Sequence, residues 1–295
     1  MTQNIAVFGL GSMGYGIAQS LLQAGHAVWG LDINSDAVAR FQAEGGQSSA
    51  PDPGTLDTVV VVVLNAAQTE SVLFGPEGIV PGLDEGACVI SCATVPPDFA
   101  RDMAARCAER GIYYLDAPIS GGSVKAAQGK LSVMAGGSAN AFAAARPALD
   151  SMAETVFELG EVGAGSAMKS VNQLLAGVHI ATMAEALTFG MTQGVSPEKF
   201  VEVISQCAGT SWMLENRAPH IVAGDYTPHS AVNIWLKDLG IVLDIAKSAK
   251  FSAPVTAAAL QQFIAAAGQG LGGEDDAAVA KVYARNTGLT LPGES

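Results

Sequence analysis

The N-terminal stretch Ile5-Ala-Val-Phe-Gly-Leu-Gly-Ser-Met-Gly14 decides the fold. Its first four residues form a short β-type run, and glycines follow at once in the spacing G-x-G-x-x-G. Met13 to Ala24 then repeats apolar residues at helical intervals, and Gly25 is a typical helix end. A strand, a glycine loop and a helix in this order predict the first βα unit of a dinucleotide-binding Rossmann domain.

Each glycine of this loop has its own expected role. Gly9 permits the tight turn, Gly11 lets the backbone approach a pyrophosphate, and Gly14 allows the helix to pack closely on the strand. The helix N-terminus would then offer N–H groups and a positive dipole end to the phosphates. The residues expected to bind the cofactor here are Gly9, Leu10, Gly11, Ser12, Met13 and Gly14.

A carboxylate closes the second predicted strand, which runs from Ala27 to Leu31. Asp32 can accept hydrogen bonds from both ribose hydroxyls of adenosine, and it would repel a 2′-phosphate. Its neighbours Ile33 and Asn34 offer no arginine to bind such a phosphate. These features favour NAD over NADP, whereas the alternative is that Asp32 is only a solvated helix cap.

Strands and helices continue to alternate as far as about residue 160. A helix that Ser35 can cap is expected to run to about Glu44. Later strands are predicted at Val59 to Leu64, Cys88 to Ser91, Tyr113 to Asp116, Leu131 to Ala135 and Val156 to Leu159. The five consecutive valines of the first of these suit a parallel strand that is covered on both faces. The pattern predicts an α/β fold with a doubly wound, mostly parallel sheet.

After about residue 160 the pattern predicts only helices. Ser166 to Gln193 reads as one long helix. Further helices are expected at about Pro197 to Cys207, Glu215 to Ala223, Ala231 to Ala249, Pro254 to Ala267 and Asp275 to Arg285. We therefore expect a Rossmann domain over residues 1–162 and an all-helical domain over 163–295, with a long interdomain helix.

Composition excludes several classes of function. The chain has 28 acidic and 15 basic residues, a net charge of -13, and no stretch that concentrates Lys and Arg. Neither a nucleic-acid surface nor an anionic-membrane surface is expected, so any anion site must be a local set of donors. Neither the cysteines nor the histidines have the spacing of a metal site. Reduced cysteines, and a first strand that begins by about Ile5, favour a cytoplasmic protein.

Two segments are candidates for binding a small acid. Ser120, Gly121 and Gly122 follow a predicted strand end, where open α/β sheets bind ligands. A hydroxyl and two bare backbone N–H groups form a plausible carboxylate cradle, although such a segment is often only a turn. Lys169 and Asn172 lie three residues apart on one face of the predicted long helix.

Their chemistry suits proton transfer to and from a hydroxyl group. A lysine held against apolar surface has its pKa lowered and can exchange protons near neutral pH, and Asn172 can hold a hydroxyl in line. Lys237, on a later helix, is a candidate for contact with the nicotinamide edge or the substrate. The plain alternative for both lysines is a solvated helix face.

Taken together, four segments resemble the signature blocks of the β-hydroxyacid dehydrogenase family, which includes 3-hydroxyisobutyrate dehydrogenase. They occur in the family's order and spacing at Gly9 to Gly14, Asp116 to Gly122, Gly165 to Asn172 and Lys237 to Leu239. The resemblance implies NAD as cofactor, an oxidoreductase acting on a small hydroxy acid, and a dimer or tetramer.

The resemblance also implies roles for individual residues. Lys169 would be the catalytic acid/base, assisted by Asn172. The cradle of Ser120, Gly121 and Gly122 would hold the substrate carboxylate, and Lys237 would border the cofactor and the substrate. Two residues that follow predicted strands, Asn65 and Thr94, would contact the dinucleotide.

One segment departs from the common family pattern. Many relatives carry Asp-x-Ser-Thr where this chain reads Ser91-Cys-Ala-Thr94. This variant is similar to the branch of the family that oxidises L-threonate, a four-carbon sugar acid, to a 2-oxo acid. Further segments similar to that branch are Asn172 to His179, Ser211 to Arg217, Asp225 to Pro228 and Gly273 to Asp276.

Other readings remain open. The same chemistry can act on 3-hydroxyisobutyrate or tartronate semialdehyde, and an NAD-binding sensor without catalysis is an alternative of another class. A sugar acid needs polar partners for its distal hydroxyls, for which Ser211, Asn216 and Arg217 are candidates.

Overall fold

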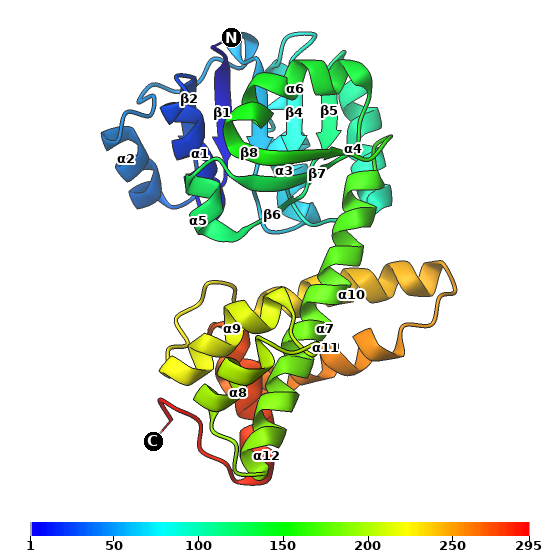
Figure 1. Ribbon diagram of the computed structural model, residues 1–295. Helices are drawn as coiled ribbons and strands as arrows, with labels where there is room; N and C mark the ends of the chain where they lie inside the picture. The colour runs from blue at the N-terminus through cyan, green and yellow to red at the C-terminus, as the bar shows by residue number, and fades with distance from the viewer. Residues whose placement is uncertain (1, 295) are drawn as a thin grey trace. The chain divides into compact units, whose positions relative to one another are not determined.

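The computed structural model describes residues 2–294, which form two compact units, the first ending at Lys169 and the second beginning at Ser170. The first unit contains a five-stranded parallel sheet with the strand order β2-β1-β3-β4-β5 (Figure 1). Its strands are β1 (Asn4–Phe8), β2 (Ala27–Leu31), β3 (Thr58–Val61), β4 (Cys88–Ser91) and β5 (Tyr113–Asp116). Its helices are α1 (Gly14–Gln23), α2 (Ser35–Ala43), α3 (Ala66–Phe74), α4 (Pro97–Ala108), α5 (Gly122–Ala127) and α6 (Ala139–Met152).

Both faces of this sheet are covered, as a doubly wound fold requires. Val60 packs into one core cluster together with residues of α1, α2 and α6, whereas Val59 and Val61 pack into a second cluster with residues of α3 and α4. Side chains alternate across a strand, so a run of valines supplies apolar surface to both clusters. The expected Rossmann fold is confirmed.

The last two predicted strands lie outside the parallel sheet. Strands β6 (Ile119–Ser120), β7 (Leu131–Ala135) and β8 (Ala153–Glu158) form a separate sheet, and β7 and β8 run across the direction of the parallel strands (Figure 1). Two residues separate β6 from the end of β5, and β6 pairs antiparallel with β7. This pairing starts a new sheet, to which β8 adds in parallel.

The cap of α2 also differs from the expected one. Asn34, not Ser35, is the capping residue, and its side-chain oxygen accepts from the backbone N–H groups of Asp36 at 3.0 Å and Ala37 at 3.4 Å. Ser35 is already the first helical residue, so it cannot serve as the cap. The prediction of Ser35 as the cap was therefore wrong by one residue.

The second unit is built from helices. α7 (Ala164–Thr192) begins in the first unit and continues into the second. The others are α8 (Pro197–Ile204), α9 (Trp212–Ala223), α10 (Val232–Ser248), α11 (Pro254–Ala266) and α12 (Ala280–Thr287). The stretch expected as one helix from Asp275 is instead a 3₁₀ turn, Asp276–Val279, followed by α12.

α7 has the length and hydropathy of a membrane span by composition alone. In the structure, however, Ile180, Met183, Ala184 and Leu187 of this helix are buried in the apolar core of the second unit. α7 is therefore a core helix.

A buried ion pair ties α9 to the 3₁₀ turn. Arg217 Nε donates to Asp276 Oδ1 at 2.6 Å, and Trp235 Nε1 donates to Asp276 Oδ2 at 2.8 Å. Asp276 is fully buried, and this burial raises the pKa of its carboxyl against the lowering effect of the Arg217 guanidinium. The two donors occupy both carboxylate oxygens, which satisfies a charge that would otherwise be costly to bury.

Candidate active site

The glycine loop has the geometry of a dinucleotide cradle. Gly9 has φ +97°, and a Cβ there would lie 2.3 Å from the Val62 carbonyl oxygen. A Cβ on Gly14 would lie 1.8 Å from the Gly9 carbonyl oxygen, so α1 packs against the loop only with glycine at this position. By contrast, apart from Gly11 itself and its two chain neighbours, no described residue has an atom within 4 Å of the Cβ position of Gly11. Open space at the start of α1 is where a pyrophosphate fits.

Asp32 is held against this loop. Its Oδ2 accepts from the Leu10 backbone N–H at 2.6 Å, and its Oδ1 accepts from the Asn34 backbone N–H at 2.8 Å. Each oxygen keeps a further lone pair for an outside donor. The cradle, the open helix N-terminus and the adjacent carboxylate together fit the pyrophosphate and ribose of NAD.

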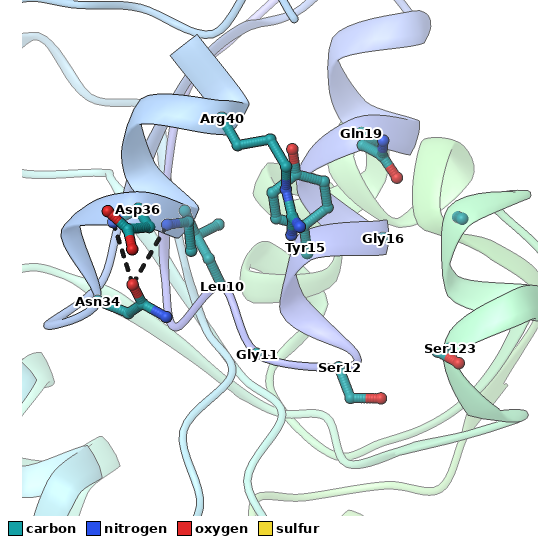
Figure 2. Close-up of a pocket in the computed structure, with 12 residues that line it drawn as sticks. Leu10, Gly11, Ser12, Tyr15, Gly16, Gln19, Asn34, Asp36, Arg40 and Ser123 are labelled. Atoms are coloured by element: carbon teal, nitrogen blue, oxygen red, sulfur yellow. Dashed lines mark hydrogen bonds between the residues drawn. The ribbon is translucent and has the colours of Figure 1, made fainter. Parts of the chain in front are cut away.

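A hollow of about 610 Å³ lies beside the loop (Figure 2). Gly11 and Ser12 lie at one end of it, and Arg40 projects from α2 over the ring of Tyr15, with its guanidinium carbon 4.0 Å from the ring centroid. The Tyr15 hydroxyl donates to Glu44 at 2.8 Å. These contacts fix the wall of the hollow that α1 and α2 form.

The two further residues expected at the cofactor follow neighbouring strands. Asn65 comes after β3 and caps α3, because its Oδ1 accepts from the Gln68 backbone N–H at 2.9 Å. Thr94 comes after β4 and is half-buried. Parallel strands end at the same edge of the sheet, so both residues follow the strands on the edge that carries the glycine loop. Their contact with the dinucleotide stays a prediction.

The expected carboxylate cradle begins at the end of β6. Ser120 closes the strand, and Gly121 and Gly122 both have positive φ, +137° and +78°. Two consecutive residues in this region of backbone space favour glycine. Apart from its chain neighbours and the backbone of its own helix, nothing described lies within 4 Å of the Cβ position of Gly122, so its backbone borders open space.

The structure brings Lys169 to this cradle. The side chain is only 9% exposed, and Nζ donates to the carbonyl oxygen of Ile119 at 2.9 Å. Ile119 directly precedes Ser120. Two motifs that the sequence offered separately, about fifty residues apart, therefore meet within the first unit.

Sequence reasoning missed the contact that anchors the start of α7. Asp116, at the end of β5, accepts from the backbone N–H groups of Gly163 at 3.0 Å and Ser166 at 2.8 Å, and from Ser166 Oγ at 2.6 Å. Burial raises the pKa of the Asp116 carboxyl, and the hydrogen bonds from Ser166 and Gly163 oppose that rise. The contact fixes α7 one turn before Lys169. The only signal in the sequence was that Asp116 opens the cradle segment.

The other two expected site residues lie in the second unit, each beside a partner that sequence reasoning did not single out. Asn172 Nδ2 donates to Gln173 Oε1 at 2.9 Å. Lys237 Nζ lies 2.8 Å from Asp238 Oδ1. Both partners are buried.

The three candidates for distal hydroxyls have structural partners instead. Ser211 caps α9 by accepting from the Leu214 backbone N–H at 3.1 Å. Arg217 pairs with buried Asp276, and its guanidinium also donates to the side-chain oxygen of Asn216. These contacts give the three residues a role in the fold, and their contact with a substrate stays a prediction.

Two of the cysteines, Cys88 and Cys92, are buried as free thiols. Burial raises the pKa of both Cys88 and Cys92 to about 12, so these groups stay protonated thiols at neutral pH. Among residues 2–294, no group of three or more His, Cys, Asp or Glu side chains is placed to hold a metal ion.

Comparison with known families covers almost the whole chain. Residues 4–160 match the model of the NAD-binding domain of 6-phosphogluconate dehydrogenase. Residues 163–283 match the model described as the NAD-binding region of NADP-dependent 3-hydroxyisobutyrate dehydrogenase. The chain belongs to the β-hydroxyacid dehydrogenase family. The relatives that are 33–49% identical to it are named dehydrogenases of hydroxy acids, and the chain is an NAD-linked hydroxy acid dehydrogenase.

Individual relatives match along their full length. The chain is 49% identical over 300 residues to L-threonate dehydrogenase of Cupriavidus necator, with 100% of both chains covered. It is 44% identical to L-threonate dehydrogenase of Escherichia coli, over 98% of this chain and 97% of that one. A crystal structure of 3-hydroxyisobutyrate dehydrogenase from Salmonella typhimurium is 44% identical, with a TM-score of 0.90, over 95% of this chain and 99% of that one.

Proposed function

We propose that this β-hydroxyacid dehydrogenase oxidises L-threonate to 2-dehydro-L-erythronate with NAD. The observation that carries the proposal is the placement of the Lys169 amine beside the Ser120 to Gly122 cradle, 2.9 Å from the Ile119 carbonyl oxygen. A proton acceptor next to a carboxylate cradle suits an acid whose hydroxyl is close to its carboxylate. Full-length similarity to proteins named L-threonate dehydrogenase supports this choice of acid.

The proposed mechanism assigns one role to each group of candidate site residues in the first unit. The loop from Gly9 to Gly14 holds the pyrophosphate, and Asp32 holds the adenosine ribose. Ser120, Gly121 and Gly122 bind the substrate carboxylate. Lys169, in its neutral amine form, takes the proton of the reacting hydroxyl as the C–H hydride leaves that carbon. NAD, when bound, supplies the acceptor for this hydride.

The remaining residues support this chemistry. Asn172 is proposed to assist Lys169 at the substrate, and Lys237 to border the substrate and cofactor. Asn65 and Thr94 are proposed to contact the dinucleotide. The protein thus supplies orientation and an acid/base group, which are the contributions that such enzymes make to a reaction carried by a cofactor.

A panel of acids tests the function. NADH formation is followed with NAD and L-threonate, D-threonate, D-erythronate, 3-hydroxyisobutyrate or glycerate. The proposal expects the highest kcat/KM for L-threonate. A highest value for 3-hydroxyisobutyrate would keep the family chemistry and contradict the sugar-acid substrate. If no acid gave NADH although the protein still bound NAD, the result would support the alternative of a non-catalytic NAD sensor.

Replacing Asp32 tests the choice of cofactor. Asp32→Ser removes the carboxylate that would bind the ribose and repel a 2′-phosphate. We expect the ratio of kcat/KM for NAD to that for NADP to fall by about 10–100-fold, as expected for one hydrogen bond to a charged group. The matched control is Asp84→Ser, at an exposed position in the loop before β4. An unchanged ratio in Asp32→Ser would remove this residue from cofactor selection.

We also propose domains of residues 1–162 and 163–295, a cytoplasmic location, and a homodimer or homotetramer. The start of α7 at Ala164 supports the domain boundary, and four free cysteines suit a reducing compartment.

The proposed assembly is supported by exposed apolar side chains on α7. Val171, Leu175 and Phe189 are 55%, 49% and 66% exposed, which leaves apolar surface for another subunit to cover. Light scattering after gel filtration should give two or four chains; a monomer at micromolar concentration would contradict the assembly.

A further inference from the structure

A chain of four side chains joins α7 to α10 inside the second unit. Asn172 Nδ2 donates to Gln173 Oε1 at 2.9 Å, and Gln173 Nε2 donates to Asp238 Oδ2 at 2.5 Å. The other oxygen, Asp238 Oδ1, lies 2.8 Å from Lys237 Nζ. Gln173 and Asp238 are only 7% and 3% exposed, so water has little access to replace these contacts.

The carboxylate sets the direction of the whole chain. A carboxylate only accepts hydrogen bonds, so Gln173 must turn its NH₂ group toward Asp238. Its carbonyl oxygen then faces Asn172, which must turn its own NH₂ group toward Gln173. Reversing either amide would place two buried acceptors or two donors against each other, and buried unsatisfied groups are costly.

This direction decides what Asn172 offers to a ligand. An asparagine side chain has two N–H donors and a carbonyl oxygen. One N–H is used by Gln173, whereas Oδ1 accepts no hydrogen bond from the part of the chain that the structure describes. The side chain is half-buried and so remains accessible. Asn172 therefore presents a carbonyl acceptor, and Asp238 fixes its orientation through the side chain of Gln173.

The reacting hydroxyl cannot satisfy this acceptor. In the proposed mechanism it gives its single proton to Lys169, so it has none left to donate to Asn172 Oδ1. A second hydroxyl can donate to it. L-Threonate carries a hydroxyl on C3, next to the C2 that becomes the 2-oxo group, whereas 3-hydroxyisobutyrate has only one hydroxyl.

We propose that Asp238 is a positioning residue that acts through Gln173 to fix Asn172 as the acceptor for a second hydroxyl beside the reacting one. The substrate class that follows is a 2,3-dihydroxy acid. This inference rests on the proposed function, since it takes Asn172 to meet the substrate.

The test compares two acids that differ in one hydroxyl. L-Threonate and 2,4-dihydroxybutyrate of the same configuration at C2 differ only at C3. For the wild-type enzyme we expect kcat/KM to favour L-threonate about tenfold or more, the effect of one net hydrogen bond of about 1.4 kcal/mol. In Asp238→Asn, the new amide can turn either its oxygen or its NH₂ group to Gln173. The preference for L-threonate is then expected to fall to about twofold or less, because the orientation of the Asn172 amide is no longer fixed.

Three further variants separate this role from a general structural one. Asp244→Asn makes the same change at an exposed position of α10 and should keep the wild-type preference. Lys237→Met removes the ion pair and leaves the carboxylate contact with Gln173, so it should also keep the preference, whatever happens to the rate. Asn172→Ala removes the acceptor itself and should lose the preference, which tests the idea even if Asp238→Asn does not fold.

The outcomes are distinct. Wild-type enzyme that oxidises both acids with equal kcat/KM would overturn the inference and leave hydroxy acid oxidation intact. An equal loss on both acids in Asp238→Asn would likewise overturn it, because the residue would then serve only the fold. A wild-type enzyme that is active on other hydroxy acids but not on L-threonate would contradict the proposed function before any variant is made.

Discussion

Replacing Lys169 with alanine is expected to lower kcat by about 10²–10⁴-fold, the usual contribution of a positioned acid/base. The proton of the reacting hydroxyl would then have no acceptor at the cradle. NAD binding should change little, because the proposed mechanism assigns the dinucleotide to the glycine loop and Asp32 and not to Lys169. Initial rates of NADH formation and the NAD dissociation constant, measured side by side, check both parts.

Lys130→Ala is a suitable control for this variant. Lys130 is exposed and lies just before β7, in the same unit. Its loss should leave kcat at the wild-type value. Turnover of Lys169→Ala equal to that of the control would remove Lys169 from the mechanism.

The second large effect is expected on stability. Arg217→Met keeps most of the apolar stem and removes the guanidinium, which leaves the fully buried Asp276 carboxylate without its charge partner. Breaking a buried pair in this way typically costs about 3–5 kcal/mol. Chemical denaturation followed by far-UV circular dichroism should show this loss in the free energy of unfolding of the helical unit.

Arg285→Met is the matched control for Arg217→Met. Arg285 lies on α12 in the same unit, is 45% exposed, and pairs with Glu294 at 3.5 Å. An exposed pair of this kind contributes about 0–1 kcal/mol. Equal losses in the two variants would show that the Arg217–Asp276 pair has no special weight in the fold.

Local sequence patterns were sufficient to predict the parallel sheet and the glycine loop. The segment from Ile5 to Gly14 contains the strand, the turn and the helix start within ten residues, so its geometry follows from neighbours in the chain. The run of valines at β3 was enough to place a buried strand. The two-residue strand β6 was missed because so short a segment has no period to detect, and the second sheet was missed with it.

Contacts between residues that are far apart in the chain could not be predicted from a single sequence. Asp116 meets Ser166 across 50 residues, Gln173 meets Asp238 across 65, and Arg217 meets Asp276 across 59. Each pair is polar, and polar residues have many alternatives at the surface of a protein. Only the packing of the elements decides which of them are buried together. The motif segments around Lys169 and Lys237 thus supplied candidate residues, while their buried neighbours Asp116 and Asp238 could be found only in the structure.

Arg217 is a further example of a residue whose partner the sequence alone could not indicate. Its type and its position near Asn216 suggested a contact with substrate hydroxyls, because arginine is a good donor. The structure instead gives it a buried partner from a turn 59 residues later in the chain. A donor that is already paired with a buried carboxylate would leave that charge unsatisfied if it turned to a ligand.

The most direct test of the central claim is to follow the hydrogen that is removed. L-Threonate labelled with deuterium at C2, and separately at C3, is oxidised with NAD, and the NADH is examined by mass spectrometry. The account predicts one deuterium in each NADH from the C2-labelled acid and none from the C3-labelled acid. Deuterium from C3, or no NADH from either acid, would contradict it.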